Sequence, residues 1–225
     1  VGKDGPSGKS SYVRRVDDKQ SWLVNTQLSA SPEIGDWLEK EIINISADRI
    51  QSASVSIGGQ KPYTAAKSSR ADADFKVEPL PKGKELSSAS AANSAATALV
   101  SLSLDDAQPK TAIVSDKPAA QATFKTFDGL VVQLDGYKKD DKRYITLATS
   151  YDAQHAERFK LKTVADDKTK TDAAGGDQSK SAPTTTPNIE EEAKTSQTKL
   201  ANWAYEIPEY KFDAIFRPLD ETLKK

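Results

Sequence analysis

ATFKTFDGLVVQLDGYKKDDKRYITLATSY, residues 122–151, carries the clearest β signal in the chain. Its three runs of β-branched and aromatic residues are separated by Asp128-Gly129 and by the polar stretch KKDDK at 138–142. An Asp-Gly link between two such runs is a strong indicator of a hairpin. The stretch therefore predicts an antiparallel meander of three strands.

Strand and helix patterns alternate upstream of the meander. Short strands are expected on either side of a polar DDKQ turn at 17–20, in SASVSI at 52–57, around Tyr63 and in DFKVE at 74–78. In SASVSI the apolar residues Ala53, Val55 and Ile57 alternate with serines, which predicts a half-buried strand. Helical spacing of apolar residues predicts helices over 31–42 and 85–104.

Downstream of the meander the pattern is interrupted. Residues 165–187 contain no large aliphatic or aromatic residue, so they bury too little surface to offset their ordering entropy, and we expect a mobile loop. After it, Asn188 and Glu191 stand in capping-box spacing at the start of a helix. WAYEIPEYKF at 203–212 then predicts a strand, and the tail predicts a final helix that is either kinked or restarted at Pro218.

Together these elements predict an α+β fold in which antiparallel β-meanders carry helices packed on one face. Parallel strand–helix–strand units are not expected, because the strongest strand pairs are joined by short turns. The chain divides into an N-terminal α+β half, residues 1–122, and a C-terminal α+β half, residues 123–225, which contains the loop at 165–187. A weak internal repeat, with helices ending near Trp37 and near Trp203, makes two similar halves an alternative to two unrelated ones.

The composition excludes several classes of protein. A net charge of −1 leaves no basic field that would recruit nucleic acid. The absence of cysteine excludes disulfides, thiol catalysis and cysteine-ligated zinc. No apolar run approaches the about 18–20 residues that span a bilayer, and no secretory signal is visible. Because the chain begins at Val1 without a methionine, we expect a signal or membrane anchor upstream.

The stretch GKDGPSGKSS at 2–11 has the residue types of a phosphate-binding loop but not its spacing. Such a loop needs a glycine, four residues and then Gly-Lys-Ser or Gly-Lys-Thr, and the position that should hold the first glycine is Lys3. No buried strand precedes the stretch and no helical pattern follows it. We therefore predict a Gly-Pro-Ser-Gly loop between antiparallel strands, and no nucleotide as a ligand.

The histidine, the paired aspartates and the aromatic residues are also candidates for a functional site, but each is expected to have a structural role. His155 is the only histidine, and without a Gly-x-Ser-x-Gly elbow in the chain it is expected to be a solvated surface residue. Paired aspartates lack the alternating spacing of a calcium loop and are expected in turns; they are Asp17-Asp18, Asp105-Asp106, Asp140-Asp141 and Asp166-Asp167. Aromatic residues that could line a ligand site are expected in the core; they are Trp22, Trp37, Trp203, Tyr205 and Tyr210. We assign no catalytic, cofactor-binding or metal-ligating residue and expect no cofactor.

Four segments carry a family resemblance as a set. They are SSYVRR…SWLV near the start, WLEKEIINISADRI at 37–50, TFDGLVVQL at 126–134 and WAYEIPEYKFDAIFRPLDETL at 203–223. The chain resembles the bacterial domain-of-unknown-function family 4340 over nearly its whole length apart from the expected loop. The resemblance implies a protein held to the cell envelope by an N-terminal hydrophobic segment that this chain lacks, and in some members a link to ABC-type transport components. It carries over no functional residue.

Two hypotheses from different classes follow. The first is a membrane-tethered module on the extracytoplasmic (periplasmic) side, not an enzyme, that contacts a membrane or envelope protein and is accessory to an ABC-type transport or envelope complex. The alternative is a carboxylate-based hydrolase, or a domain that binds a small ligand or glycan. A pocket with clustered, desolvated carboxylates would favour the alternative, whereas exposed sheet edges or an apolar patch would favour the first. The oligomeric state stays open.

Overall fold

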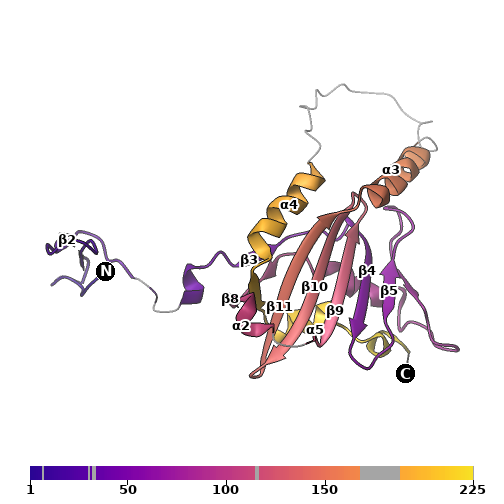
Figure 1. The fold of residues 1–225 in the computed structure, drawn as a ribbon, viewed down its shortest axis with the longest axis horizontal. Coiled ribbons are helices and arrows are strands. Elements are labelled where there is room, and N and C mark those ends of the chain that lie inside the picture. The colour runs from indigo at the N-terminus through magenta and orange to yellow at the C-terminus, as the bar shows by residue number, and fades with distance from the viewer. Residues whose placement is uncertain (7, 30, 32–33, 115–116, 168–187, 225) are drawn as a thin grey trace. The chain divides into compact units, whose positions relative to one another are not determined.

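The computed structural model describes residues 1–6, 8–29, 31, 34–114, 117–167 and 188–224 (Figure 1). The chain forms two compact units, an N-terminal unit (Val1–Leu38) and a main unit (Glu39–Lys225). Among the described residues, no helix is both long and apolar enough to cross a membrane.

The N-terminal unit is built around a two-stranded ribbon. β1 (Ser11–Val13) pairs antiparallel with β2 (Trp22–Val24), which places Tyr12 opposite Leu23. The segment before β1 runs beside it, because the N–H of Gly2 donates to the carbonyl of Tyr12. The 3-10 helix η1 (Ile34–Trp37) follows near the end of the unit. Both strands expected beside the DDKQ turn are confirmed.

The main unit contains a fully antiparallel sheet of eight strands, which confirms the α+β class with antiparallel pairing. From one edge to the other the strands are β6 (Lys76–Glu78), β5 (Tyr63–Ala66), β4 (Ile50–Ile57), β9 (Ala120–Thr126), β10 (Leu130–Lys139), β11 (Lys142–Tyr151), β12 (Trp203–Glu206) and β8 (Asp106–Pro109). A separate two-stranded sheet joins β3 (Glu41–Ile43) to β7 (Leu102–Ser103). The strands expected at 52–57, around Tyr63 and at 74–78 are confirmed as β4, β5 and β6.

Short helices complete the main unit. The α-helices are α1 (Asn93–Thr97), α2 (Lys110–Ile113), α3 (Ala153–Asp167), α4 (Ile189–Leu200) and α5 (Glu209–Ile215), and the 3-10 helices are η2 (Ala89–Ala92) and η3 (Leu219–Thr222). The side chain of Asn188 accepts the N–H of Glu191, so the expected cap of α4 is confirmed. Pro218 caps η3 after α5 has ended, which confirms a restart rather than a kink at this proline.

β9, β10 and β11 form the predicted meander at the centre of the sheet (Figure 1). Gly129 makes the first turn with φ of +93°, a backbone conformation that favours glycine. Asp140 and Asp141 make the second turn with φ of +50° and +61°, where short polar side chains are tolerated. Both turns predicted from the sequence, at Asp128-Gly129 and in 138–142, are therefore confirmed.

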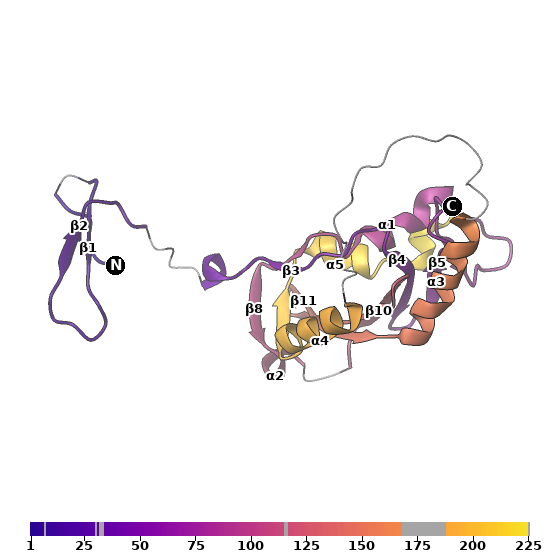
Figure 2. The same cartoon turned by 90° about the horizontal axis from the view of Figure 1, so that it is seen from above.

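One face of the sheet carries the core. Phe124, Val132, Leu134 and Ile145 are fully buried on it. A Cβ added at Gly136 would lie 2.6 Å from Phe216 and 2.9 Å from Phe212, so α5 packs directly on β10 at this glycine. Figure 2 shows α1 and α5 on the same side of the sheet. Polar side chains of β4, β9 and β10 alternate onto the opposite face, as expected for an antiparallel sheet with one packed face.

α4 lies alongside the part of β11 that β12 does not reach. β12 pairs with β11 at Tyr144 and Ile145. Further along β11, the N–H of Thr149 donates to the side chain of Gln197 at 2.6 Å, and its hydroxyl donates to the carbonyl of Ala193 at 2.8 Å. The helix therefore provides hydrogen-bond acceptors for Thr149 at an edge of β11 that pairs with no strand there.

Two helix predictions are wrong over most of their length. In the stretch 31–42, the described helix is only η1, and Glu41–Ile43 forms β3 instead. In 85–104 the helical turns end at Thr97, and Leu102–Ser103 forms β7. β3 and β7 pair with each other, so a long-range contact overrides the helical spacing of both segments. Pro32 and Glu33, which belong to the first predicted helix, lie outside the described residues.

The expected division of the chain falls inside a strand. Residues 122 and 123 both belong to β9, which pairs with β4 on one side and β10 on the other. One sheet thus contains strands from both expected halves, whereas the compact units divide after Leu38. Of the loop expected at 165–187, the first three residues end α3 and 168–187 lie outside the described residues. α3 itself was not expected from the sequence.

Candidate functional site

The glycine-rich stretch at 2–11 is a turn between bridged segments. Asp4 and Ser11 form an antiparallel bridge, and the N–H of Gly5 donates to the carbonyl of Ser10 at 2.7 Å. Gly8 has φ of +65°, and the segment continues into β1 rather than into a helix. The antiparallel pairing expected around the loop is confirmed at Asp4 and Ser11, although the segment before the loop forms only this bridge and residue 7 lies outside the described residues. A strand, β1, follows the loop where a phosphate-binding loop would be followed by a helix.

The ribbon of the N-terminal unit exposes apolar side chains on both faces. Tyr12 and Leu23 are opposite each other and are 39% and 49% exposed. Trp22, on the other face, is 53% exposed, and Val16 in the connecting turn is 96% exposed. These four residues form what is called here the hairpin surface. An exposed apolar side chain is ordinary when it stands alone, whereas several of them close together mark contact sites.

The aromatic residues expected in the core are mostly outside it. Of the five, only Tyr205 is buried, at 6% exposure. Trp22, Trp37, Trp203 and Tyr210 are exposed, so the prediction is wrong for these four. Trp22 and Trp37 belong to the N-terminal unit, where a ribbon of two short strands offers no core to bury them.

Neither edge strand of the main sheet, β8 or β6, is well suited to pair with a further strand. β8 is the outer strand at one edge, and the N–H of Ala107 already donates to the carboxylate of Asp106 at 2.8 Å. Pro109 has no N–H to offer. β6, at the other edge, has three residues and is followed by Pro79. Short strands, proline and charge are the devices by which proteins protect edges, so the sheet edges offer little to a partner.

His155 lies in the first turn of α3 and is half-buried rather than solvated, so that prediction is wrong. Its backbone N–H donates to the carboxylate of Asp152 at 3.0 Å, and its imidazole ring lies 4.9 Å from the ring of Phe159. The Nε2 atom is buried and has no hydrogen-bond partner among the described residues. Burial lowers the pKa of the imidazole, as do the nearby charges of Lys125 and Arg158, while Asp152 opposes the shift.

This burial predicts a pH dependence of stability. Below the ordinary histidine pKa of about 6.5, the unfolded chain binds a proton that folded His155 resists, so the free energy of unfolding falls as the pH drops below about 6.5. Urea unfolding between about pH 7.5 and pH 5 measures this slope. His155→Gln should flatten it. An identical slope in the parent and the variant would contradict the assignment.

The paired aspartates are dispersed over the structure. Asp17 and Asp18 lie in the turn between β1 and β2, and Asp140 and Asp141 form the β10–β11 turn, as predicted. Asp106 is instead the first residue of β8, so the turn prediction is wrong there. Asp166 and Asp167 end α3. In the part of the chain that the structure describes, no three acidic or histidine side chains cluster in a way that could hold a metal ion.

The shifted pKa values of the described groups all lie further from neutrality than usual. Hydrogen bonds lower the pKa of several carboxyl groups, namely Glu39, Asp48, Asp72, Glu85, Asp152 and Glu190. Hydrogen bonds to carboxylates raise the pKa of Lys142 and Lys194. Burial raises the pKa of the Tyr205 phenol to about 12. These shifts therefore follow from hydrogen bonding and, for Tyr205, from burial.

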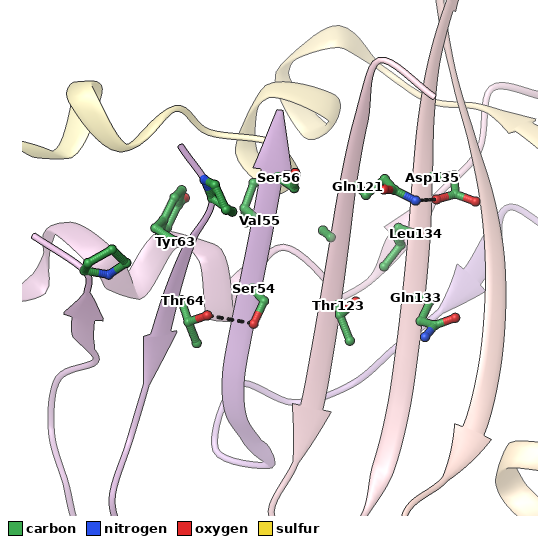
Figure 3. A pocket seen from close by; sticks show the side chains of 13 residues that line it. Ser54, Val55, Ser56, Tyr63, Thr64, Gln121, Thr123, Gln133, Leu134 and Asp135 are labelled. Atoms are coloured by element: carbon green, nitrogen blue, oxygen red, sulfur yellow. Dashed lines mark hydrogen bonds between the residues drawn. The ribbon is translucent and has the colours of Figure 1, made fainter. Parts of the chain in front are cut away.

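A concave groove of about 560 Å³ lies on the polar face of the main sheet (Figure 3). β4, β5, β9 and β10 supply its floor, and Asp135 is the one carboxylate among the described lining residues. Its lining therefore lacks the carboxylate pair that glycoside hydrolysis requires. Sequence reasoning missed this groove, although the serines that alternate with Ala53 and Val55 already indicated a polar strand face.

Comparison with known families adds one relationship. The family model described as Domain of unknown function (DUF4340) matches residues 1–123, which is more than half of the chain. This range contains SSYVRR…SWLV and WLEKEIINISADRI, whereas the other two segments behind the sequence resemblance lie beyond it. No curated protein and no solved structure matches the chain.

Proposed function

The chain belongs to the family described as Domain of unknown function (DUF4340), and from this premise we propose that it is a membrane-tethered extracytoplasmic module that acts by protein–protein contact. The contact site is the hairpin surface. The partner is a component of a membrane or envelope complex of the ABC-type transport class, which the chain assists without converting a substrate.

The observation that carries the proposal is the exposure of Tyr12, Trp22 and Leu23 on a ribbon of two short strands. Tryptophan and tyrosine dominate the binding energy of many interfaces, because they bury a large rigid surface and keep a polar group for a hydrogen bond. A ribbon with apolar groups on both faces fits between two surfaces of a partner. It also fits a partner that is itself assembled from several subunits.

The size of the N-terminal unit supports the same proposal. A two-stranded ribbon is marginally stable in water, and domains below about 40 residues usually need a disulfide, a metal or a partner. The unit has 38 residues and the chain has no cysteine. In the described residues no metal cluster is formed. Contact with a partner would add stability to such a ribbon.

The electrostatics favour contact over catalysis. The described groups with shifted pKa values are shifted away from neutrality, and the groove on the main sheet contains a single carboxylate, Asp135. A hydrolase of the alternative hypothesis would need a paired acid and base in one pocket. The closed edge at β8 also makes strand addition there a poor means of docking, which leaves side-chain contact through the hairpin surface.

Site-specific photo-crosslinking in intact cells tests the proposal. The full-length protein, with its native N-terminus, carries a photoreactive phenylalanine at position 22, or at position 203 as the control. Trp203 is also an exposed tryptophan, at 44%, but belongs to the main unit. We expect position 22 to crosslink to a subunit of a membrane complex and position 203 not to do so. Crosslinks to soluble cytoplasmic proteins alone would contradict the proposal.

A binding variant adds a quantitative test on the complex recovered in this way. Trp22→Ser should weaken it by roughly thirtyfold, because an aromatic hot spot contributes about 2 kcal/mol or more. Trp203→Ser is the matched control and should change the affinity less than about threefold. Equal effects of the two exchanges would show that the hairpin surface is not the contact site.

A further inference from the structure

The groove on the polar face of the main sheet has an organisation that its amino-acid types alone do not reveal. The pairing register places Thr64, Ser54, Thr123 and Gln133 in one row across the strands. Ser56, Gln121 and Asp135 form a second row beside it. The side chains of both rows are labelled in Figure 3. Adjacent strands are about 4.8 Å apart, so each row offers polar groups at that repeat.

Two contacts hold part of this floor in place. The hydroxyls of Ser54 and Thr64 share a hydrogen bond of 2.9 Å, and the amide of Gln121 donates to the carboxylate of Asp135 at 2.7 Å. In contrast, Ser56, Thr123 and Gln133 have no side-chain partner among the described residues. Four of the seven polar side chains in the two rows are therefore held by a neighbour, and the other three are available to a ligand.

The charges of the groove select the class of ligand. Its described lining contains no cation. Lys125, which alternates onto the same face of β9, is paired with Asp152 at 3.1 Å. An anionic ligand thus finds no counter-charge, and an apolar ligand would strip water from hydroxyls and amides without replacing their hydrogen bonds. A neutral ligand with many donors and acceptors avoids both costs.

The position of the groove on the sheet face disfavours one class of neutral ligand, an extended peptide. It lies on a face of the sheet, where the backbone groups of β4, β9 and β10 already bond within the ladder. An extended peptide would find no backbone partners there. Hydroxyl and carboxamide side chains both donate and accept, as sugar hydroxyls do. Pro62 and Pro79 border one end and provide apolar surface for the C–H face of a sugar ring.

From these observations we infer that the groove binds an uncharged oligosaccharide that lies across β5, β4, β9 and β10. Thr123 and Gln133 contact its hydroxyl groups directly, and Asp135, oriented by Gln121, accepts from a further hydroxyl. With a single carboxylate in the lining, the groove binds the sugar and leaves its glycosidic bonds intact. The inference does not depend on the contact proposed for the hairpin surface.

Titration of the ¹⁵N-labelled chain tests the inference. The neutral probes are cellohexaose, maltohexaose and chitohexaose, and the anionic control is hexagalacturonate. We expect at least one neutral probe to shift the amide resonances of Thr123 and Gln133 saturably, with a Kd of about 1 mM or tighter. If no neutral probe shifts them at about 10 mM, or if hexagalacturonate binds as tightly, the inference is overturned.

Variants of similar shape separate binding from folding. Thr123→Val replaces the hydroxyl with a methyl group and keeps a residue that favours strands. Gln133→Leu removes the carbonyl and the NH2 of the side-chain amide from an exposed position. Each should weaken binding about fivefold to tenfold, the loss of one or two hydrogen bonds. Ser150→Ala, on β11 outside the groove, is the control. Undiminished binding by both groove variants would overturn the assignment.

Discussion

Gly129→Ala is expected to destabilise the main unit by about 3–5 kcal/mol. Gly129 has φ of +93°, a conformation that side chains rarely adopt. An added Cβ would also lie 2.7 Å from the carbonyl oxygen of Asp152 and 2.8 Å from the Cβ of Ala156. Neither atom is the end of a flexible side chain, so the start of α3 would have to move away from the turn. Urea unfolding followed by far-UV circular dichroism measures the loss.

A second glycine separates the two causes. Gly59 has φ of +79°, and a Cβ added there would meet nothing within 4 Å. Gly59→Ala therefore reports the conformational cost alone, about 1 kcal/mol. If Gly129→Ala were no more destabilising than Gly59→Ala, the close packing of α3 on the first turn of the meander would be wrong.

The parts of the fold that the sequence predicts correctly depend on local chemistry. Asp128-Gly129 and the KKDDK stretch specify the two turns of the meander, because few residues tolerate positive φ. Asn188 specifies the start of α4 through its own side chain. The alternation of Ala53 and Val55 with serines specifies both the strand β4 and which of its faces is buried. Each signal acts within about ten residues of itself.

The parts that the sequence did not predict depend on pairing at long range. The strand expected at 203–212 is confirmed only as β12 (Trp203–Glu206), because α5 begins at Glu209. Its pairing with β8, which places Trp203 opposite Pro109 from far earlier in the chain, was not predicted. β3 and β7 form strands because they pair with each other, although the apolar residues of both segments have helical spacing. The two rows of the groove require the register of four strands, so no single segment contains the site. Trp22 and Trp37 were misplaced because the sequence does not reveal that the N-terminal unit has no core to bury them.

Arg49 connects distant segments of the main unit through one guanidinium group. Its Nε donates to Asp128 at 2.9 Å in the first turn of the meander. Its two terminal nitrogens donate to the two carboxylate oxygens of Glu192 in α4, each at 3.1 Å. The Arg49 side chain is 23% exposed. Burial alone would lower the pKa of the guanidinium, but the hydrogen bonds to Glu192 and Asp128 outweigh it and raise the pKa.

Replacement of this arginine should have the second large effect. Arg49→Met keeps much of the apolar stem but leaves Asp128 and Glu192 without their shared cation, so we expect a loss of about 2–3 kcal/mol in the free energy of unfolding. Fully buried pairs lose about 3–5 kcal/mol, and the partial exposure of this network reduces the value. Arg49→Lys should lie between the parent and the methionine variant, because an ammonium group cannot bond both oxygens of Glu192 in parallel.

Two comparisons make the Arg49 result specific. Lys194→Met removes the exposed pair with Glu190 on the same helix and should change stability by less than about 0.5 kcal/mol. Glu192→Gln combined with Arg49→Met should lose less than the sum of the two single exchanges, because the neutral amide no longer needs the cation. An additive result, or an Arg49→Met cost as small as that of Lys194→Met, would contradict the network. The predicted coupling means that Arg49 stabilises the fold, because it connects α4 through Glu192 to the β9–β10 turn that contains Asp128 and Gly129.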